Sequence, residues 1–175
     1  ELFKNKIEKY SENIAFIIKN RAGSNQKYTN ITYKEFGLDI NSLGSSLIKR
    51  GLKGKRIAVI APNRYEWMVS YLATLNGVGI VVPLDKGLPN NEIESLLQRS
   101  KADAVIFDKS YHDVMKEIQN NKTTNIEHFI CMDEDNEFIS LNSLIEEGKK
   151  LLEEGYKEYL KAEINEEEMS VILFT

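Results

Sequence analysis

IAVIAPNRYEWMVSYLATLNGVGIVVPLDKGLPNNEI, residues 57–93, is the stretch that decides the fold. It begins in a continuous apolar run, 56–61, and reaches a second one, 80–84, after a segment of helical length. Short unbroken apolar runs rich in β-branched residues are typical of strands that are buried on both faces, as in a parallel sheet. The segment between the runs, 63–77, predicts a helix with Asn63 as its N-cap.

The alternation of strands and helices continues along the chain. Further strands are predicted at 103–107, 127–132 and 170–174. Two further helices are predicted to begin at Thr32 and at Pro89, and two more are predicted over 110–119 and 141–154. Residues 133–138 predict a surface loop. This spacing is typical of βαβ units. It predicts an α/β fold with a doubly wound, mostly parallel sheet flanked by helices.

The N-terminal part is expected to depart from this pattern. A helix over 2–10 precedes two short strands, 15–19 and 30–33, whose polar tip contains a glycine, and this predicts a β-hairpin. Thr32 and Glu35 have the spacing of a capping box at the start of the next helix. The stripe of that helix that we expect to be buried consists of Phe36, Ile40, Leu43 and Leu47.

The charge of the chain is unevenly distributed. Its 175 residues have a net charge of −4, but residues 1–110 hold 17 Lys and Arg against 11 Asp and Glu, a net of +6, whereas residues 111–175 have a net of −10. The acidic part argues against a nucleic-acid partner. The basic part could favour an anionic partner, although a solvated face explains it as well.

The composition indicates a folded protein that is one domain or one large lobe of a bigger one. No apolar run approaches the ~18 residues that cross a bilayer, so we expect no transmembrane segment. Cys131 is the single cysteine and lies in an apolar run. We interpret it as a buried structural thiol in a reducing, cytoplasmic compartment.

Three motif-like features lie in the wrong place or lack a residue. The glycines at 77–79 precede a strand, whereas the phosphate-binding turn of a dinucleotide site follows one, so they predict the end of a helix. GLKGKR, 51–56, has an arginine where a P-loop has Ser or Thr, and it predicts a turn. Asp85 follows a predicted strand and is interpreted as a turn or capping carboxylate, with a ligand or metal site as the alternative.

Other candidate residues favour structural roles. His112 and His128 have no ligand-like spacing to the cysteine, which argues against a metal site. Trp67 is expected to pack in the core between its helix and the sheet, with a substrate platform as the alternative. The residues alone reveal neither a nucleophile with its base, nor a metal cluster, nor a complete phosphate cradle.

Three stretches in fixed order resemble the N-terminal part of the adenylate-forming enzymes, which comprise acyl-CoA synthetases, luciferases and the adenylation domains of peptide synthetases. These are ITYKEF at 31–36, the long stretch at 57–93 and SVILFT at 170–175. The resemblance covers nearly the whole chain. It implies that residues 1–175 are the N-terminal subdomain of the large adenylate-forming domain, without the remainder of that domain or the small C-terminal domain.

In that family, a strand such as VILFT runs into a loop rich in glycine and hydroxyl residues that binds the phosphates of ATP. The resemblance implies that Thr175 is the first residue of this loop and the chain's one cofactor-binding position. It also implies that the catalytic and magnesium-binding residues lie further along, so none is assigned here. Backbone N–H groups, hydroxyls and a lysine in such a turn can surround a triphosphate.

The resemblance further implies a two-step reaction. A small-molecule carboxylate attacks the α-phosphate of ATP in the presence of magnesium, and the thiol of coenzyme A then displaces AMP. NRYEW and VVPLDKGLPNNEI look most like long-chain fatty-acid CoA ligases, since Lys86 and Leu88 stand where amino-acid adenylation domains have Pro and Tyr. The alternatives are an amino-acid adenylation domain and, from another class, a complete non-catalytic α/β binding module. Residues 1–175 alone are expected to be inactive.

We predict that the codons after Thr175 in the parent gene encode Ser-Gly, then two residues that are each Ser or Thr, then Gly. The reason is that in the resembling family this apolar strand and its threonine lead directly into the phosphate-binding loop. Sequencing the gene past this position tests the prediction. A stop codon, or a charged helix immediately after the threonine, would contradict it.

Overall fold

The computed structural model describes residues 2–19, 27–165 and 167–174. Its α-helices are α1 (Leu2–Lys9), α2 (Tyr33–Lys49), α3 (Tyr65–Ala73), α4 (Asn90–Ser100), α5 (His112–Asn121) and α6 (Leu141–Glu153), with a π-helical turn η1 (Thr74–Val78) and a 3-10 turn η2 (Lys109–Tyr111). Its strands are β1 (Ile14–Lys19), β2 (Tyr28–Thr32), β3 (Arg56–Ile60), β4 (Ile80–Pro83), β5 (Ala104–Phe107), β6 (His128–Cys131) and β7 (Ile139–Ser140).

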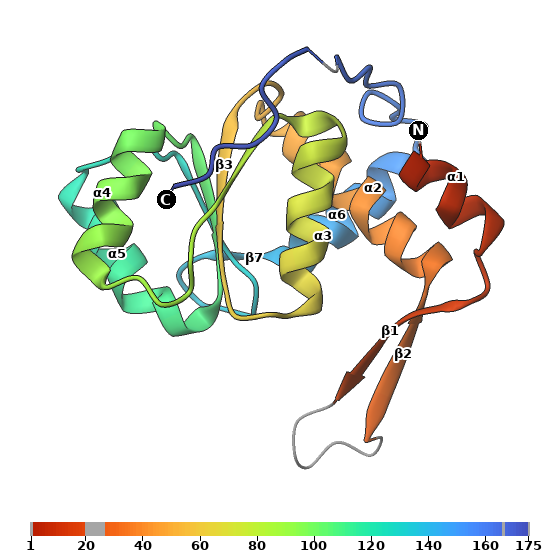
Figure 1. Ribbon diagram of the computed structural model, residues 1–175, viewed down its shortest axis with the longest axis horizontal. Helices are drawn as coiled ribbons and strands as arrows, with labels where there is room; N and C mark the ends of the chain where they lie inside the picture. The colour runs from red at the N-terminus through yellow and green to blue at the C-terminus, as the bar shows by residue number, and fades with distance from the viewer. Residues whose placement is uncertain (1, 20–26, 166, 175) are drawn as a thin grey trace.

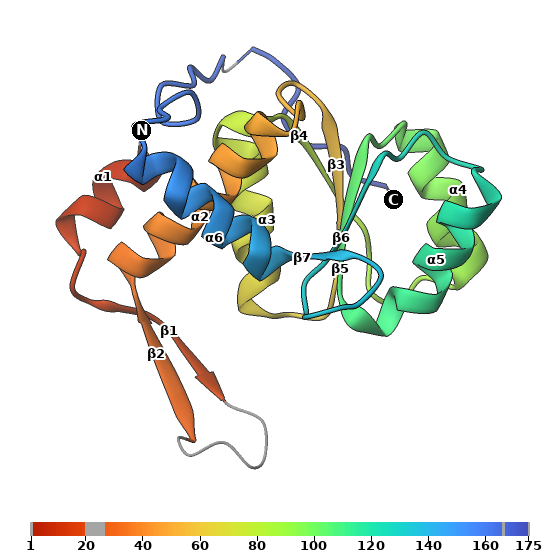
Figure 2. The same cartoon turned by 180° about the vertical axis from the view of Figure 1, so that it is seen from behind.

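Five strands form a parallel sheet in the order β4-β3-β5-β6-β7. Helices α2, α3 and α6 lie on one side of the sheet and α4 and α5 on the other (Figures 1 and 2). The predicted α/β architecture with a parallel sheet flanked by helices is therefore confirmed.

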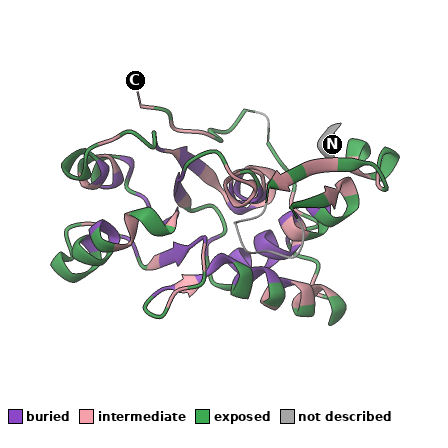
Figure 3. Ribbon diagram, turned by 90° about the horizontal axis from the view of Figure 1, so that it is seen from below, coloured by how far each residue is buried: buried purple, intermediate pink, exposed green. Residues whose placement is uncertain are grey.

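β3 shows why the apolar runs predict this fold. Ile57 and Val59 belong to the core cluster on the α2 side, while Ala58 and Ile60 belong to the cluster on the α4 side, and all four are fully buried. Figure 3 shows the buried residues concentrated in the strands and on the inward faces of the helices. A strand enclosed in this way has to be apolar on both faces.

The N-terminal hairpin forms as predicted. β1 and β2 pair antiparallel, with a register shift between Ile14 and Phe16. The Phe16 ring packs edge-on against Phe36, at 4.8 Å between centroids, and against Tyr65, at 5.2 Å. The predicted capping box at Thr32 is present, and it starts α2 where β2 ends. The hairpin projects away from the five-stranded sheet (Figure 1).

The prediction of a strand at 170–174 was wrong. This segment makes an isolated bridge, Val81 to Val171, beside β4, and it has no strand of its own. Leu173 is 69% exposed, so the outer side of the segment lacks the burial that an apolar strand normally has. The fifth strand of the sheet is instead β7 at the opposite edge, in a position that the sequence analysis had not assigned to a strand.

Two predictions in the helix after β3 were also wrong. The N-cap of α3 is Arg64 rather than Asn63, and it makes no side-chain capping bond. Trp67 is not enclosed between its helix and the sheet, whereas Val69 and Ala73 of the same helix are fully buried. Trp67 is partly buried and stacks on Tyr71, at 5.1 Å between ring centroids.

The loop 133–138 is less superficial than predicted. Phe138 is buried and packs perpendicular to Phe107, at 5.1 Å between ring centroids. The loop thus places one aromatic side chain in the core before it leads into β7.

Helices α2 and α6 of one layer cross with their backbones in close contact. A Cβ added to Gly148 of α6 would overlap the backbone carbonyl of Ser42 in α2. A Cβ added to Gly44 of α2 would overlap the ring of Tyr159, whose hydroxyl donates to the Ala73 carbonyl at 3.1 Å. Glycine is therefore required where these elements cross.

We predict that Gly148→Ala destabilises the chain by at least about 3 kcal/mol, the upper part of the range for overpacked cores, because the obstructing atoms belong to the backbone. Urea unfolding followed by circular dichroism measures the change. Lys150→Ala, an exposed position in the same helix, is the control and should change the free energy of unfolding by less than about 0.5 kcal/mol. Equal stability of the two variants would contradict the close crossing.

Candidate functional site

The carboxyl edge of the five-stranded sheet is the first place to look for a site. In open α/β sheets, ligands bind outside the carboxyl ends of the strands, at the point where the strand order reverses. Here the chain passes from β3 to β4 on one side and then crosses to β5 on the other, so the reversal lies between β3 and β5. Arg64 follows β3, and Asp108 directly follows β5.

A cluster of charged side chains occupies this point. The Arg64 guanidinium donates to Asp108 at 2.5 Å, to Asp133 at 2.8 and 3.1 Å, and to Glu66 at 2.7 Å. Asp133 follows β6, so one arginine joins the ends of three strands. We call these four residues the Arg64 cluster.

The surroundings of Arg64, Asp108 and Asp133 favour their charged forms. Hydrogen bonding from Arg64 holds the pKa of Asp133 below its usual value, against the opposing effect of burial. Burial would raise the pKa of Asp108, but hydrogen bonds from Ser110 and Arg64 outweigh it and lower that pKa. Burial opposes the charge of Arg64, yet its carboxylate partners raise its pKa further. Arg64, Asp108 and Asp133 are therefore charged at neutral pH.

The charge balance of the cluster limits what it can bind. One guanidinium faces three carboxylates, and its N–H groups already point at them. A triphosphate would meet net negative charge here. The Arg64 cluster is therefore a structural link across the strand ends rather than an anion site.

Sequence reasoning did not single out the Arg64 cluster, although a signal existed. A charged residue follows the predicted strand in each of three cases, and parallel strands bring their carboxyl ends to the same edge. The pattern identifies charged groups at one edge, but the choice of partners depends on the strand order.

The loop after β4 is arranged by a turn carboxylate, as predicted. The Asp85 side chain accepts a hydrogen bond from the Gly87 N–H at 2.6 Å, which makes it part of a local turn. The Tyr111 hydroxyl donates to the Lys86 carbonyl at 2.8 Å and holds the loop from the side of η2.

Residues 170–174 run alongside β4 toward this same edge. The Val81 N–H donates to the Ser170 carbonyl and the Ile172 N–H donates to the Val81 carbonyl, each at 3.0 Å. Phe174 then packs against the core on the α4 side, with the Arg99 guanidinium 5.3 Å from its ring centroid. Phe174 and Arg99 line a small hollow with Leu84, Asp85 and Leu88. The segment thus reaches the carboxyl edge at Phe174.

Thr175, the predicted cofactor-binding residue, lies outside the described residues, and its role remains a prediction. The last described residue, Phe174, lies beside the loop that follows β4.

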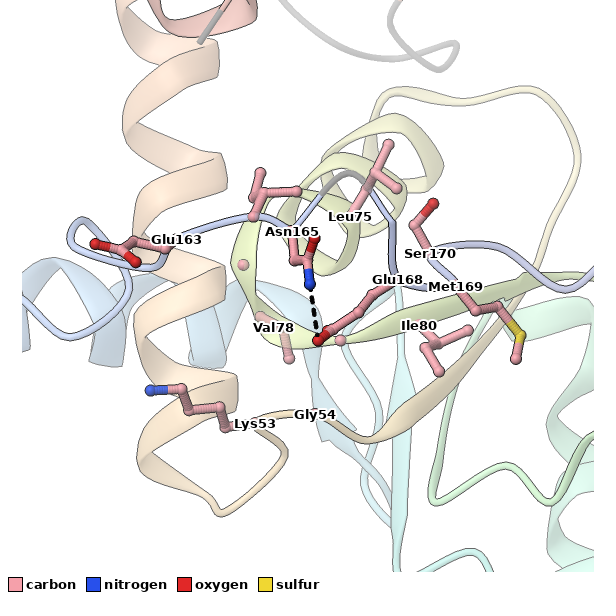
Figure 4. Close-up of a pocket in the computed structure, with 13 residues that line it drawn as sticks. Lys53, Gly54, Leu75, Val78, Ile80, Glu163, Asn165, Glu168, Met169 and Ser170 are labelled. Carbon is pink, nitrogen blue, oxygen red and sulfur yellow. Dashed lines mark hydrogen bonds between the residues drawn. The ribbon is translucent and has the colours of Figure 1, made fainter.

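A second hollow lies at the other end of β4 (Figure 4). It is lined by the glycines at 77–79, by Lys53 and by residues of 163–170, among which the Asn165 side chain donates to Glu168 at 3.2 Å. Lys53 is paired with Glu158 at 3.1 Å. Gly79 packs against the Lys55 backbone, and Gly77 has φ +147°, so these glycines serve a helix end and close packing, as predicted.

The remaining candidate residues have structural surroundings. Cys131 is fully buried, and burial raises the pKa of its thiol, as expected for a structural cysteine. The described residues contain no group of three or more His, Cys, Asp or Glu side chains placed to hold a metal ion. Within the same residues, no helix combines the length and apolarity that crossing a membrane requires.

Comparison with known protein families identifies the family to which this chain belongs. Residues 3–175 match the family described as AMP-binding enzyme. The chain belongs to that family. Its fold is similar to that of a long-chain-fatty-acid-CoA ligase from Archaeoglobus fulgidus, with a TM-score of 0.79 and 20% identity over 99% of this chain and 33% of that one.

Relatives among AMP-binding enzymes differ in their named activities. The chain is 30% identical over 168 residues to long-chain-fatty-acid–CoA ligase 5 of Rattus norvegicus. The aligned region covers 86% of this chain and 24% of the relative. The chain is 25% identical over 119 residues to tyrocidine synthase 1 of Brevibacillus parabrevis, covering 67% of this chain and 10% of the relative. The chain therefore spans about a quarter or less of the length of these relatives.

We predict that Arg64→Met lowers the free energy of unfolding at pH 7 by about 2–3 kcal/mol, somewhat less than for a fully buried pair, because the cluster is partly exposed. Because Asp108 and Asp133 have lowered pKa values in the folded state, their stabilisation is present above their unfolded pKa of about 3.9 and is lost as pH falls through the folded values. The difference between wild type and variant should therefore shrink below about pH 4.

Urea unfolding at neutral and acidic pH measures this difference. Arg50→Met is the matched control, because Arg50 pairs with Glu147 at 2.6 Å at a more exposed position and should cost less than about 1 kcal/mol. A difference for Arg64→Met that is independent of pH would show that the carboxylates do not depend on the arginine.

Proposed function

We propose that residues 1–175 are the N-terminal subdomain of the large domain of an ATP-dependent acyl-CoA ligase whose carboxylate substrate is a fatty acid. The observation that carries the proposal is the 30% identity to the rat long-chain-fatty-acid–CoA ligase over 86% of this chain. Lys86 and Leu88, which differ from the Pro and Tyr typical of amino-acid adenylation domains, favour the same substrate class.

The proposed contribution of this chain is to place the start of a phosphate-binding loop. The bridge at Val81 and the packing of Phe174 hold 170–174 beside β4 and direct it to the carboxyl edge. Thr175 follows directly, so its N–H and hydroxyl are proposed as the first donors to the phosphates of ATP. The Arg64 cluster supports this edge by joining the ends of β3, β5 and β6.

The proposed reaction has two steps. A carboxylate oxygen of the substrate bonds to the α-phosphorus of ATP while the bond to the pyrophosphate oxygen breaks, which yields an acyl-adenylate. The sulfur of coenzyme A, having lost its proton, then bonds to the acyl carbon, and AMP leaves with the oxygen that it gained. Electrostatic stabilisation of the developing phosphate charge is the main catalytic requirement of the first step.

Magnesium and the catalytic groups are proposed to be held by residues beyond this chain. The carboxylates of the Arg64 cluster are engaged by the arginine, and the described residues hold no alternative group suited to a metal ion. The buried free thiol of Cys131 is consistent with a proposed location in the reducing cytoplasm.

A peptide-synthetase adenylation domain is the second candidate. The similarity to tyrocidine synthase 1 favours it, at lower identity and over less of the chain. A complete non-catalytic α/β module has less support, since the chain belongs to a family of enzymes. The substrate that triggers pyrophosphate release separates the first two candidates.

We predict that the longer parent protein releases pyrophosphate from ATP with medium- or long-chain fatty acids and not with amino acids, and that residues 1–175 alone release none. Removing one oxyanion-type donor already costs about a hundredfold to a thousandfold in rate, and the chain alone offers one threonine at its end. Its affinity for ATP should be weaker than about 1 mM. Pyrophosphate release and calorimetry with ATP measure both.

Thr175→Ala in the parent protein tests the assigned residue. Its turnover should fall about tenfold to a hundredfold, Thr175→Ser should retain most of it, and Ser170→Ala, which removes an exposed hydroxyl on the same segment, should leave it unchanged. Saturable turnover by residues 1–175 alone would place the active site elsewhere, and release driven by an amino acid would favour the second candidate.

A further inference from the structure

The N-terminal elements form one end of the molecule. Helix α1 and the β1–β2 hairpin lie on the side of α2 that faces away from the five-stranded sheet, and the hairpin extends beyond the body of the fold (Figures 1 and 2). The inner face of the hairpin is occupied, since Phe16 packs on Phe36 and Tyr65. The side chains Ile17 and Tyr28 on its outer face belong to neither hydrophobic core cluster.

The outer face of the hairpin exposes two large apolar or aromatic side chains next to two polar ones. Ile17 stands opposite Asn30 and Lys19 opposite Tyr28, so these four side chains share the face turned away from Phe16. Ile17 is 66% exposed and Tyr28 49% exposed. Ile17 also lines a hollow with Trp67 and with Met68, which is 38% exposed.

Two lysines lie at this surface. Lys19 lies on the face itself and Lys27 lies over the Tyr28 ring at 5.6 Å, whereas Lys6 and Lys9 lie over the Tyr10 ring, at the base of the hairpin, at 5.7 and 5.4 Å. None of these four lysines has a carboxylate partner among the described residues. Residues 1–34 contain seven Lys and Arg against three Asp and Glu, whereas the whole chain has a net charge of −4.

This combination distinguishes two kinds of partner. The buried centres of protein–protein interfaces are depleted in lysine, because desolvating an ammonium group is costly. Surfaces that lie on a bilayer combine isoleucine-like and aromatic side chains with lysines, whose stems lie along the apolar region while their ammonium groups reach the anionic headgroups. Unpaired lysines next to exposed Ile17 and Tyr28 fit the second description.

We propose that the outer face of the hairpin docks on an anionic lipid surface, where Ile17 and Tyr28 enter the interfacial region and Lys19 and Lys27 contact the headgroups. The site does not rest on the proposed ligase activity, and Arg64 and Glu66 of the Arg64 cluster line the same hollow as Ile17 and Trp67. Binding is electrostatic and superficial, so it is reversible and sensitive to salt.

Vesicle co-sedimentation of residues 1–175 tests the proposal. The chain should bind vesicles of phosphatidylcholine with about 30 mol % phosphatidylserine, should bind phosphatidylcholine alone much more weakly, and should dissociate at about 0.5 M salt. Because the whole chain is acidic, anionic vesicles attract it only through a segregated basic surface. Equal binding to both vesicles, or to neither, would overturn the proposal.

Trp67 provides a signal from the docking surface itself, because it is the chain's single tryptophan and shares the hollow with Ile17. Its emission should shift to shorter wavelength on addition of anionic vesicles, and lipids brominated near the headgroup should quench it. Sedimentation with vesicles without any change in Trp67 emission would place the contact elsewhere and overturn the assignment.

Matched lysine variants separate this surface from general charge. Lys19→Gln with Lys27→Gln should weaken vesicle binding about 25-fold, since each lysine near an anionic surface contributes roughly a factor of five. Lys101→Gln with Lys122→Gln changes the net charge equally at the far ends of α4 and α5 and should change binding less than about twofold. Equal losses in the two double variants would overturn the proposal.

Two further outcomes identify other occupants of the surface. Ile17→Ser should weaken vesicle binding without changing the thermal melt, because the side chain is exposed in the free protein. If the chain instead forms dimers that Ile17→Ser dissociates, a second copy covers the face. If the longer parent protein fails to bind the same vesicles, the rest of the parent covers it. Either result would overturn lipid docking.

Discussion

The enclosure of β3 is the constraint on which the rest of the structure depends. Its side chains are buried on both faces, and its backbone pairs with β4 on one edge and β5 on the other. Such a strand needs an apolar sequence, two neighbouring strands and a helical layer on each face. The α2, α3 and α6 layer and the α4 and α5 layer meet this need, and the parallel direction of the strands brings their carboxyl ends to one edge.

The Arg64 cluster is a consequence of that edge. Loops that leave parallel strands side by side bring charged residues together, and a guanidinium can satisfy several carboxylates at once because its N–H groups form a rigid fork. In this chain the cluster occupies the point where the strand order reverses, which in many α/β proteins is left open for a ligand. The segment 170–174 reaches the same edge beside β4, away from the cluster.

The sequence alone predicts the strands and helices whose signals are local. The capping box at Thr32, the turn carboxylate Asp85 and the apolar run of β3 belong to this class, and each has the structure expected of it. The failures concern properties set by neighbours in space. The strand predicted at 170–174 has β4 on one side only, the position of Trp67 depends on where α3 begins, and Arg64 takes partners from loops 44 and 69 residues away. The proposed phosphate-binding residue comes from family resemblance rather than from any pattern of charge or spacing.

The crossing of α2 and α6 has a consequence for how the protein is made. Ser42 of α2 has to meet Gly148 of α6, so the apolar stripe of α2 stays without its final cover until about 100 further residues have left the ribosome, which at 5–20 residues per second takes roughly 5–20 s. Over that interval the nascent chain exposes Leu43 and Leu47, which become fully buried in the finished fold. Synthesis thus passes through a stage in which chaperones have an apolar helix to bind, and the arrival of α6 ends it.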